Sequence, residues 1–189
     1  EFDLTLSGLN FAPIGTTTNP FNGKFNGFGA NFILDINGTN SLGLFGVTGD
    51  DSEIYQLSTS GEIKGSNYAG GIAGYNNGYI HDVFSSVIID ANDYVGGLVG
   101  YNDGQLHDSF YIGEVKGSSY VGGVSGQNND EIKNVYAVSK TSANNNLGGI
   151  VGFNQGDISY AYYNEEVIQF YHPDIGQTPS LAVGNESNT

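Results

Sequence analysis

Two His-Asp pairs are, by residue type, the best candidates for chemistry. His81-Asp82 and His107-Asp108 occupy equivalent positions in two successive copies of an internal repeat. A histidine beside a carboxylate can serve as a general acid–base pair or contribute to a metal site. Two carboxylates on neighbouring strands also approach the spacing that retaining glycosidases use. The competing interpretation is a pair of polar positions on a solvent-facing strand.

Acidic side chains at turns form a second set of candidates, as ligands for Ca²⁺. Calcium prefers carboxylate and carbonyl oxygens. The pattern here matches neither the EF-hand loop nor the nonapeptide calcium repeat, so a solvated acidic turn is the alternative. No other cofactor is expected. The metal candidates are Asp50, Asp51, Glu53, Asp82 and Asp108.

Motifs that would indicate catalysis are missing from the sequence. It contains no G-x-S-x-G, no H-E-x-x-H, no Walker loop and no zinc-ligand spacing, and it has no cysteine. These motifs supply an activated nucleophile, a metal-bound water or a phosphate cradle. We therefore assign no catalytic residue and expect a protein that is not an enzyme.

Aromatic residues are frequent, with 13 Tyr and 11 Phe but no Trp. Equivalent positions form columns, which predict either an exposed ladder for a sugar ring or peptide or rings that stack on one another. A further column that begins at Phe84 is expected to lie in the interior. The candidate ligand-binding residues are Tyr68, Tyr94, Tyr120, Tyr75 and Tyr101.

The charge balance narrows the classes of partner. The net charge is −15, with only 5 Lys and Arg in 189 residues. Such a field repels nucleic acid and anionic lipid. No apolar run is long enough to span a bilayer, so no membrane insertion is expected. The expected partners are neighbouring domains of a larger chain and a host glycan or protein.

An internal repeat must position all of these residues. Glycine-rich segments recur with a spacing of roughly 26 residues, a period in the range of solenoid repeats. A repeat that combines Gly, Asn and β-branched residues, without helical periodicity, favours short strands joined by turns. Propeller blades need about 40 residues, so one copy is typical of a single solenoid turn. The segments are Ser41–Gly46, Tyr68–Gly74, Tyr94–Gly100, Tyr120–Gly126 and Asn146–Gly152.

The predicted fold is all-β, a right-handed parallel β-helix (β-solenoid) of about five coils. Handedness follows the usual preference of parallel β connections. Equivalent residues would stack about 4.8 Å apart, with interior columns that begin at Ala69, Ile72 and Ile80. The paired glycines between the first two columns indicate a corner where a Cβ would clash with the next coil. An asparagine ladder is expected at Asn76, Asn102, Asn128 and Asn154.

The repeat also divides the chain. Residues 1–40 are expected to supply N-terminal capping strands and the first coil, because an open coil end exposes strand edges. Residues 41–163 hold the repeats. Residues 164–189 are interpreted as a C-terminal cap and linker, with a last strand near 165–171. Within the repeats, Lys133-Asn134 and Ser159-Tyr160 replace the His-Asp pair in later copies, which favours the solvent-facing interpretation of that position.

The repeat resembles the GLUG motif. The likeness is carried by Gly43–Gly46, Gly97–Gly100 and Gly149–Gly152, with the Tyr-Asn that follows Gly100 and the Phe-Asn that follows Gly152, by an entry at Phe11–Gly15 and Phe21–Gly27 and by an exit at 162–164. Gln127 and Asn146 depart from the pattern, because aromatics are expected there. The resemblance covers residues 9–165. It implies a segment of a large secreted or surface-displayed bacterial protein, such as an adhesin-like exoprotein or an immunoglobulin A peptidase, and no catalytic residues.

The expected function is thus a non-catalytic structural or interaction module, adhesin-like and extracellular or on the bacterial cell surface. Two alternatives remain open. A polysaccharide-active enzyme is one, because β-helices host lyases and hydrolases, although 5 Lys and Arg disfavour a lyase for acidic glycans. An accessory domain of a secreted peptidase is the other.

Overall fold

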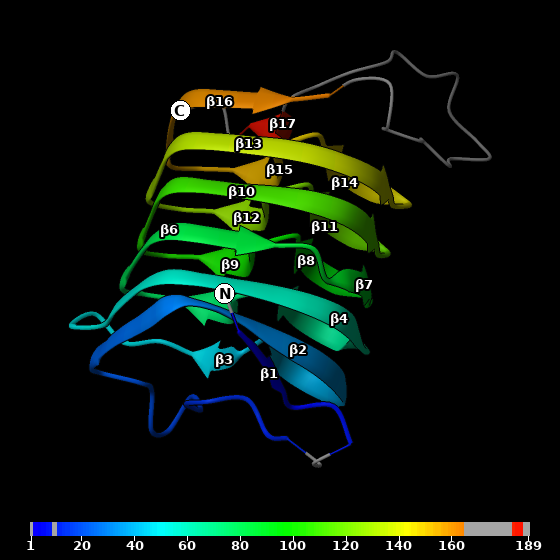
Figure 1. The fold of residues 1–189 in the computed structure, drawn as a ribbon. Helices are drawn as coiled ribbons and strands as arrows, with labels where there is room; N and C mark the ends of the chain where they lie inside the picture. The colour runs from blue at the N-terminus through cyan, green and yellow to red at the C-terminus, as the bar shows by residue number, and fades with distance from the viewer. Residues whose placement is uncertain (1, 9–10, 165–182, 187–189) are drawn as a thin grey trace.

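A stack of parallel strands forms the whole of the described chain. The computed structural model describes residues 2–8, 11–164 and 183–186, and within these ranges it contains strands and no helix. The chain winds through about six turns whose strands lie about 26 residues apart, rising from the first turn in blue to the last in orange (Figure 1). The β-solenoid is therefore confirmed. About five coils were expected, and the structure has about six.

Each turn has three faces. The first face holds β6 (Tyr79–Ser85), β7 (Ile88–Asp90), β10 (Gln105–Lys116), β13 (Glu131–Ser142) and β16 (Asp157–Tyr163). The second holds β8 (Asp93–Gly96), β11 (Ser119–Gly122) and β14 (Asn145–Gly148). Two long strands, β2 (Lys24–Leu42) and β4 (Glu53–Gly70), span both faces. The third holds β3 (Phe45–Val47), β5 (Ala73–Asn76), β9 (Val99–Asn102), β12 (Ser125–Asn128), β15 (Val151–Asn154) and β17 (Val183–Glu186).

The register places repeat-equivalent residues directly above one another. Leu106 pairs with Ile80 on one side and with Ile132 on the other. These three side chains have no exposed surface, and neither do Ile72, Leu98, Val124 and Ile150 of the column at the next corner. Fully buried aliphatic side chains are the main source of favourable free energy in such a narrow core. The predicted interior columns are confirmed.

The bends of the chain fall on residues with a left-handed backbone. Two columns of non-glycine residues have positive φ, an uncommon conformation that Asn and Asp tolerate best. The first column lies within the strands of the first face. The second lies on the second face, in the strands that lead to the paired glycines. The first consists of Phe28, Gln56, Asp82, Asp108, Asn134 and Tyr160, and the second of Ser41, Tyr68, Tyr94, Tyr120 and Asn146.

The left-handed residue also reverses which side chains face inward. Leu106 is buried, but beyond Asp108 the buried residues are Ser109 and Tyr111, and Phe110 points outward. The expectation that the Phe84 column is interior is therefore wrong. Phe110 and Tyr136 are each 42% exposed, and Tyr162 is 61% exposed. A strand alternates with a period of two, so one residue out of phase moves every later side chain to the other face.

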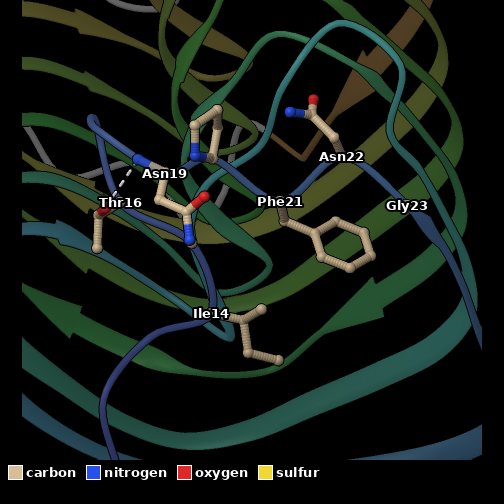
Figure 2. Close-up of a pocket in the computed structure, with 8 residues that line it drawn as sticks. Ile14, Thr16, Asn19, Phe21, Asn22 and Gly23 are labelled. Carbon is tan, nitrogen blue, oxygen red and sulfur yellow. Dashed lines mark hydrogen bonds between the residues drawn. The ribbon is translucent and has the colours of Figure 1, made fainter.

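The N-terminal segment adds strand pairs below the first turn. β1 (Asp3–Thr5) lies parallel to residues 31–33 of β2, and Ile14 and Phe21 form single parallel bridges with Phe45 and Thr48. The loop that holds Ile14 and Phe21 encloses a shallow hollow of about 380 Å³ (Figure 2). Within the loop, the backbone N–H of Asn19 donates to Thr16 Oγ1 at 3.1 Å, and backbone hydrogen bonds such as Phe21 N–H to the Val47 carbonyl at 3.0 Å join the loop to the first turn. The hollow is lined by this one loop, without charged side chains.

At the other end, β17 lies parallel to β15, with Val183 paired to Val151. These four residues therefore form a strand that extends the third face. The strand expected near 165–171 lies outside the described residues. None of the described segments is a helix able to cross a membrane.

Candidate functional site

The two His-Asp pairs lie where the repeat places them, on adjacent coils, with His81 paired in register to His107. His81 Nδ1 lies 2.9 Å from Asp82 Oδ2, whereas His107 Nε2 lies 3.0 Å from Glu131 Oε2. The two imidazoles thus have different carboxylate partners. His81 is also covered by the ring of Tyr79, at a centroid distance of 4.4 Å. A repeated catalytic pair would need the same partner geometry in both copies, and this is not the arrangement observed.

The acidic candidates for calcium are spread over the surface. Glu53 is bound by Lys24 and lies 3.4 Å from His81. Asp108 accepts a hydrogen bond from Asn134 at 2.5 Å. Asp50 and Asp51 are exposed at the turn between β3 and β4. Over the described ranges, no three His, Cys, Asp or Glu side chains converge in a way that could hold a metal ion.

The tyrosine columns form one interlocked cluster. Tyr94 stacks on Tyr68 and Tyr120 at centroid distances of 4.8 and 4.7 Å, and Tyr75 stacks on Tyr101 at 4.7 Å. The two columns also meet edge to face, as Tyr94 and Tyr101 do at 5.6 Å. In each stacked pair, one face of each ring is covered by the neighbouring tyrosine. All five rings are half-buried, and a ligand-binding role for them stays a prediction.

Hydrogen bonds tie the second tyrosine column to polar side chains of later coils. Tyr75 donates from its hydroxyl to Asp103 at 2.7 Å, and Asn129 donates its amide to the Tyr101 hydroxyl at 2.7 Å. Gln127 stands where an aromatic was expected, and its amide reaches the Tyr101 hydroxyl at 3.3 Å. The departure from the repeat is thus accommodated by a hydrogen bond that replaces a ring contact.

The asparagines form a continuous ladder at the end of the third face. Each side-chain amide donates to the carbonyl oxygen of the next: Asn76 to Asn102 at 2.8 Å, Asn102 to Asn128 at 2.8 Å and Asn128 to Asn154 at 2.9 Å. Thr48 extends the ladder downward by donating to Asn76 at 2.8 Å. Each amide also donates to a turn carbonyl, as Asn102 does to Gly104 at 2.7 Å. The ladder satisfies buried polar groups and leaves them no capacity for a ligand.

Exposed aromatic side chains lie on the first face, where sequence reasoning did not place them. Phe84, Phe110, Tyr136 and Tyr162, here called the aromatic row, project outward beside the first left-handed column. Exposed Ile112, at 45%, widens the apolar strip. Contiguous apolar patches of more than a few hundred Å² mark interaction sites, so this strip is the candidate interaction surface. The signal in the sequence was the Asp or Asn two residues before each of the first three rings, a residue type that tolerates the left-handed bend.

A groove runs along the aromatic row, across the strands. Its larger hollow, of about 760 Å³, is lined by Phe28, Gly29, Gln56, Leu57, Ser58, Asp82, Val83, Phe84, Asp108 and Phe110. A second hollow, of about 320 Å³, is lined by Asp108, Ser109, Phe110, Asn134, Val135, Tyr136 and Tyr162. Asp108 and Phe110 line both hollows, so the two are adjacent along the row. The groove therefore crosses β2, β4, β6, β10, β13 and β16, which Figure 1 shows as neighbouring arrows.

Burial raises the pKa of several tyrosines above the usual value of 10.0. The effect is largest for Tyr75 and for Tyr111, whose hydroxyl donates to the Val87 carbonyl at 2.8 Å; Tyr94 and Tyr101 shift in the same direction. The folded state thus favours the neutral phenols. Below the unfolded-state pKa this contribution to stability is fully present, and it is lost as pH rises above about 10.

We expect the melting temperature to fall steeply between about pH 9.5 and pH 12, as the unfolded chain releases phenol protons that the folded chain retains. Circular dichroism melts across this range measure it. Tyr111→Phe should cost about 1 kcal/mol at neutral pH through the lost hydrogen bond and should flatten the alkaline decline. Tyr162→Phe is the control at neutral pH: its ring is exposed, so the substitution should leave stability nearly unchanged. A melting temperature constant through pH 12 would contradict the assignment.

Comparison with known proteins bears on the fold. No family model matches the sequence, and no curated protein matches it. One solved structure is similar, described as a putative immunoglobulin A1 protease from Bacteroides ovatus, with a TM-score of 0.70 and 20% sequence identity; the match covers 98% of this chain and 74% of that chain. At this identity the likeness shows a shared fold. The GLUG resemblance has no support from a family model.

Proposed function

We propose that this chain is a non-catalytic interaction module of a larger secreted or surface-displayed bacterial protein, and that it presents its partner-binding surface on the first face of the solenoid. The observation that carries the proposal is the exposed aromatic row beside two adjacent hollows, together called the groove. The other repeated polar and aromatic columns are occupied by contacts between coils. The parallel stack itself holds neighbouring domains apart.

Two observations support the proposal of an extracellular parent. The GLUG-type repeat implies adhesin-like exoproteins or immunoglobulin A peptidases, and the structural neighbour is described as a putative protease of the latter kind. An accessory domain of a secreted peptidase and an adhesin module are both consistent with an inert fragment. A host protein or glycan would be the partner of either, reached through the groove.

A polysaccharide-active enzyme is the second candidate, because Asp82 and Asp108 line the same groove from adjacent coils. A retaining glycosidase needs one carboxyl group as nucleophile and one as acid, each free to act. Here Asp82 contacts His81, and Asp108 accepts from Asn134. These contacts disfavour either carboxylate as a free nucleophile or acid, while both side chains stay exposed as negative charges.

We expect no reducing-end release when the purified chain is incubated with a panel of neutral and acidic glycans, and no cleavage of an immunoglobulin A substrate. The same assay on Asp108→Ala separates the two functions. Release by the wild-type protein that disappears in the variant would establish an enzyme and overturn the proposal, provided that circular dichroism shows both proteins folded.

A further inference from the structure

We propose that the groove beside the aromatic row binds an extended segment of a partner protein in which basic residues are interspersed with apolar ones. This rests on the proposed function and specifies the chemistry of the partner. The groove runs across the strands, so a ligand lying in it would follow the solenoid axis. In the middle coils it would meet one Asp or Asn and one ring per coil.

The shape of the groove suits a linear chain. Its floor includes Leu57, Val83 and Val135, which are no more than 3% exposed. At its lower end, β2 contains extra residues relative to β4, with a register shift between Asn26 and Ala30. This bulge pushes out Phe28, which is 80% exposed and lines the groove there. Bulges often redirect a side chain at a functional edge.

The charge of the groove favours a cationic partner. Asp82 and Asp108 are exposed and line it, and no lysine is among its lining residues. Four of the chain's five Lys and Arg residues are engaged elsewhere: Lys24 with Glu53, Lys64 with Glu62, Lys116 with Asp90 and Lys140 with Glu114. The net charge of −15 adds a long-range attraction that steers cations.

The aromatic row discriminates between a peptide and a sugar. The rings of Phe84 and Phe110 stack on each other at a centroid distance of 4.4 Å and 22°, so each covers a face of the other. A sugar ring packs on an aromatic face, and that face is occupied between these two rings. Ring edges remain available to alkyl stems of Lys and Arg, which lie along apolar surface while their charged ends reach carboxylates. Together with the exposed carboxylates of Asp82 and Asp108, this favours the basic peptide over a neutral glycan.

The test is isothermal titration calorimetry of the intact chain, which has no Trp for fluorescence, with a synthetic peptide of alternating Lys and Phe. A peptide of alternating Glu and Phe and a neutral cello-oligosaccharide are titrated in parallel. We expect binding of the Lys-Phe peptide alone, weakened by added salt because exposed charge pairs are screened.

Two matched pairs of variants locate the site. Asp82→Asn with Asp108→Asn should weaken binding by roughly fivefold or more, the range for two exposed charge pairs, whereas Asp50→Asn with Asp51→Asn removes the same charge outside the groove and should change it less than twofold. Phe110→Ala should weaken binding severalfold, and Ile88→Ala, another exposed apolar residue at 49%, should not. Circular dichroism checks that each variant is folded.

Equal weakening by both Asp pairs would show attraction to the whole surface and overturn the groove proposal. Binding of the oligosaccharide that is lost in Phe110→Ala would overturn the choice of a peptide while leaving the interaction module in place. Binding of no probe, with no turnover in the glycan assay, would also refute the basic-peptide proposal without contradicting a non-catalytic module. Cleavage of the oligosaccharide would contradict both.

Discussion

Gly97→Ala is expected to destabilise the protein by about 3 kcal/mol, at the upper end of the usual cost of overpacking a core. A Cβ at this position would meet the carbonyl oxygen of Gly123 in the coil above and the ring of Tyr111 inside the solenoid, both well within van der Waals contact. The backbone oxygen cannot move without disturbing the next coil. Tyr111 is fully buried and has no free space to enter.

Urea unfolding of wild type and variant, followed by circular dichroism, measures the effect. Gly23→Ala is the matched control, because its Cβ would touch only the ring of Phe21, at 3.2 Å, in the N-terminal loop. We expect the control to change stability by less than about 1 kcal/mol. Similar midpoints for Gly97→Ala and wild type would show that the coils can separate at this corner, and would contradict the packing described.

Asn102→Ala is expected to cost about 2 kcal/mol, since removal of a buried hydrogen-bonding group leaves its partners unsatisfied. The substitution removes the donor to Asn128, the acceptor for Asn76 and the donor to the Gly104 carbonyl. All three hydrogen bonds are in the buried part of the ladder. The loss is therefore larger than for a surface asparagine.

The same denaturant titration measures this loss, and two variants calibrate it. Asn154→Ala removes the top rung, which is half-buried and has one ladder neighbour among the described contacts, so its cost should be smaller. Asn145→Ala removes an exposed asparagine and should be nearly neutral. A change of only a few tenths of a kcal/mol in Asn102→Ala would mean that the ladder does not stabilise the fold.

The sequence predicts which aromatic residues form columns, but not which way each column faces. The tyrosine columns were recognised because their positions repeat, but a repeat alone does not say whether rings stack on each other or face a partner. The aromatic row was recognised as a column and assigned to the wrong side of the strand. The groove was not anticipated, because its lining residues are spread over six strands and Phe28 lies in a bulge that interrupts the repeat.

The sequence by itself determined that the chain forms parallel coils, one per repeat, with aliphatic columns inside and an amide ladder along one edge. The reason is that each residue of a stacked repeat meets its own equivalents, so a column of matching side chains predicts its own contacts. Only the tertiary structure decided which side of the first face each column occupies. The left-handed φ of Asp108 reverses the alternation, turning Tyr111 inward beneath Gly97 and Phe110 outward to line the groove. Asp or Asn stands at three of the six positions of this left-handed column, but Phe28, Gln56 and Tyr160 adopt the same φ, so residue type alone did not predict the reversal.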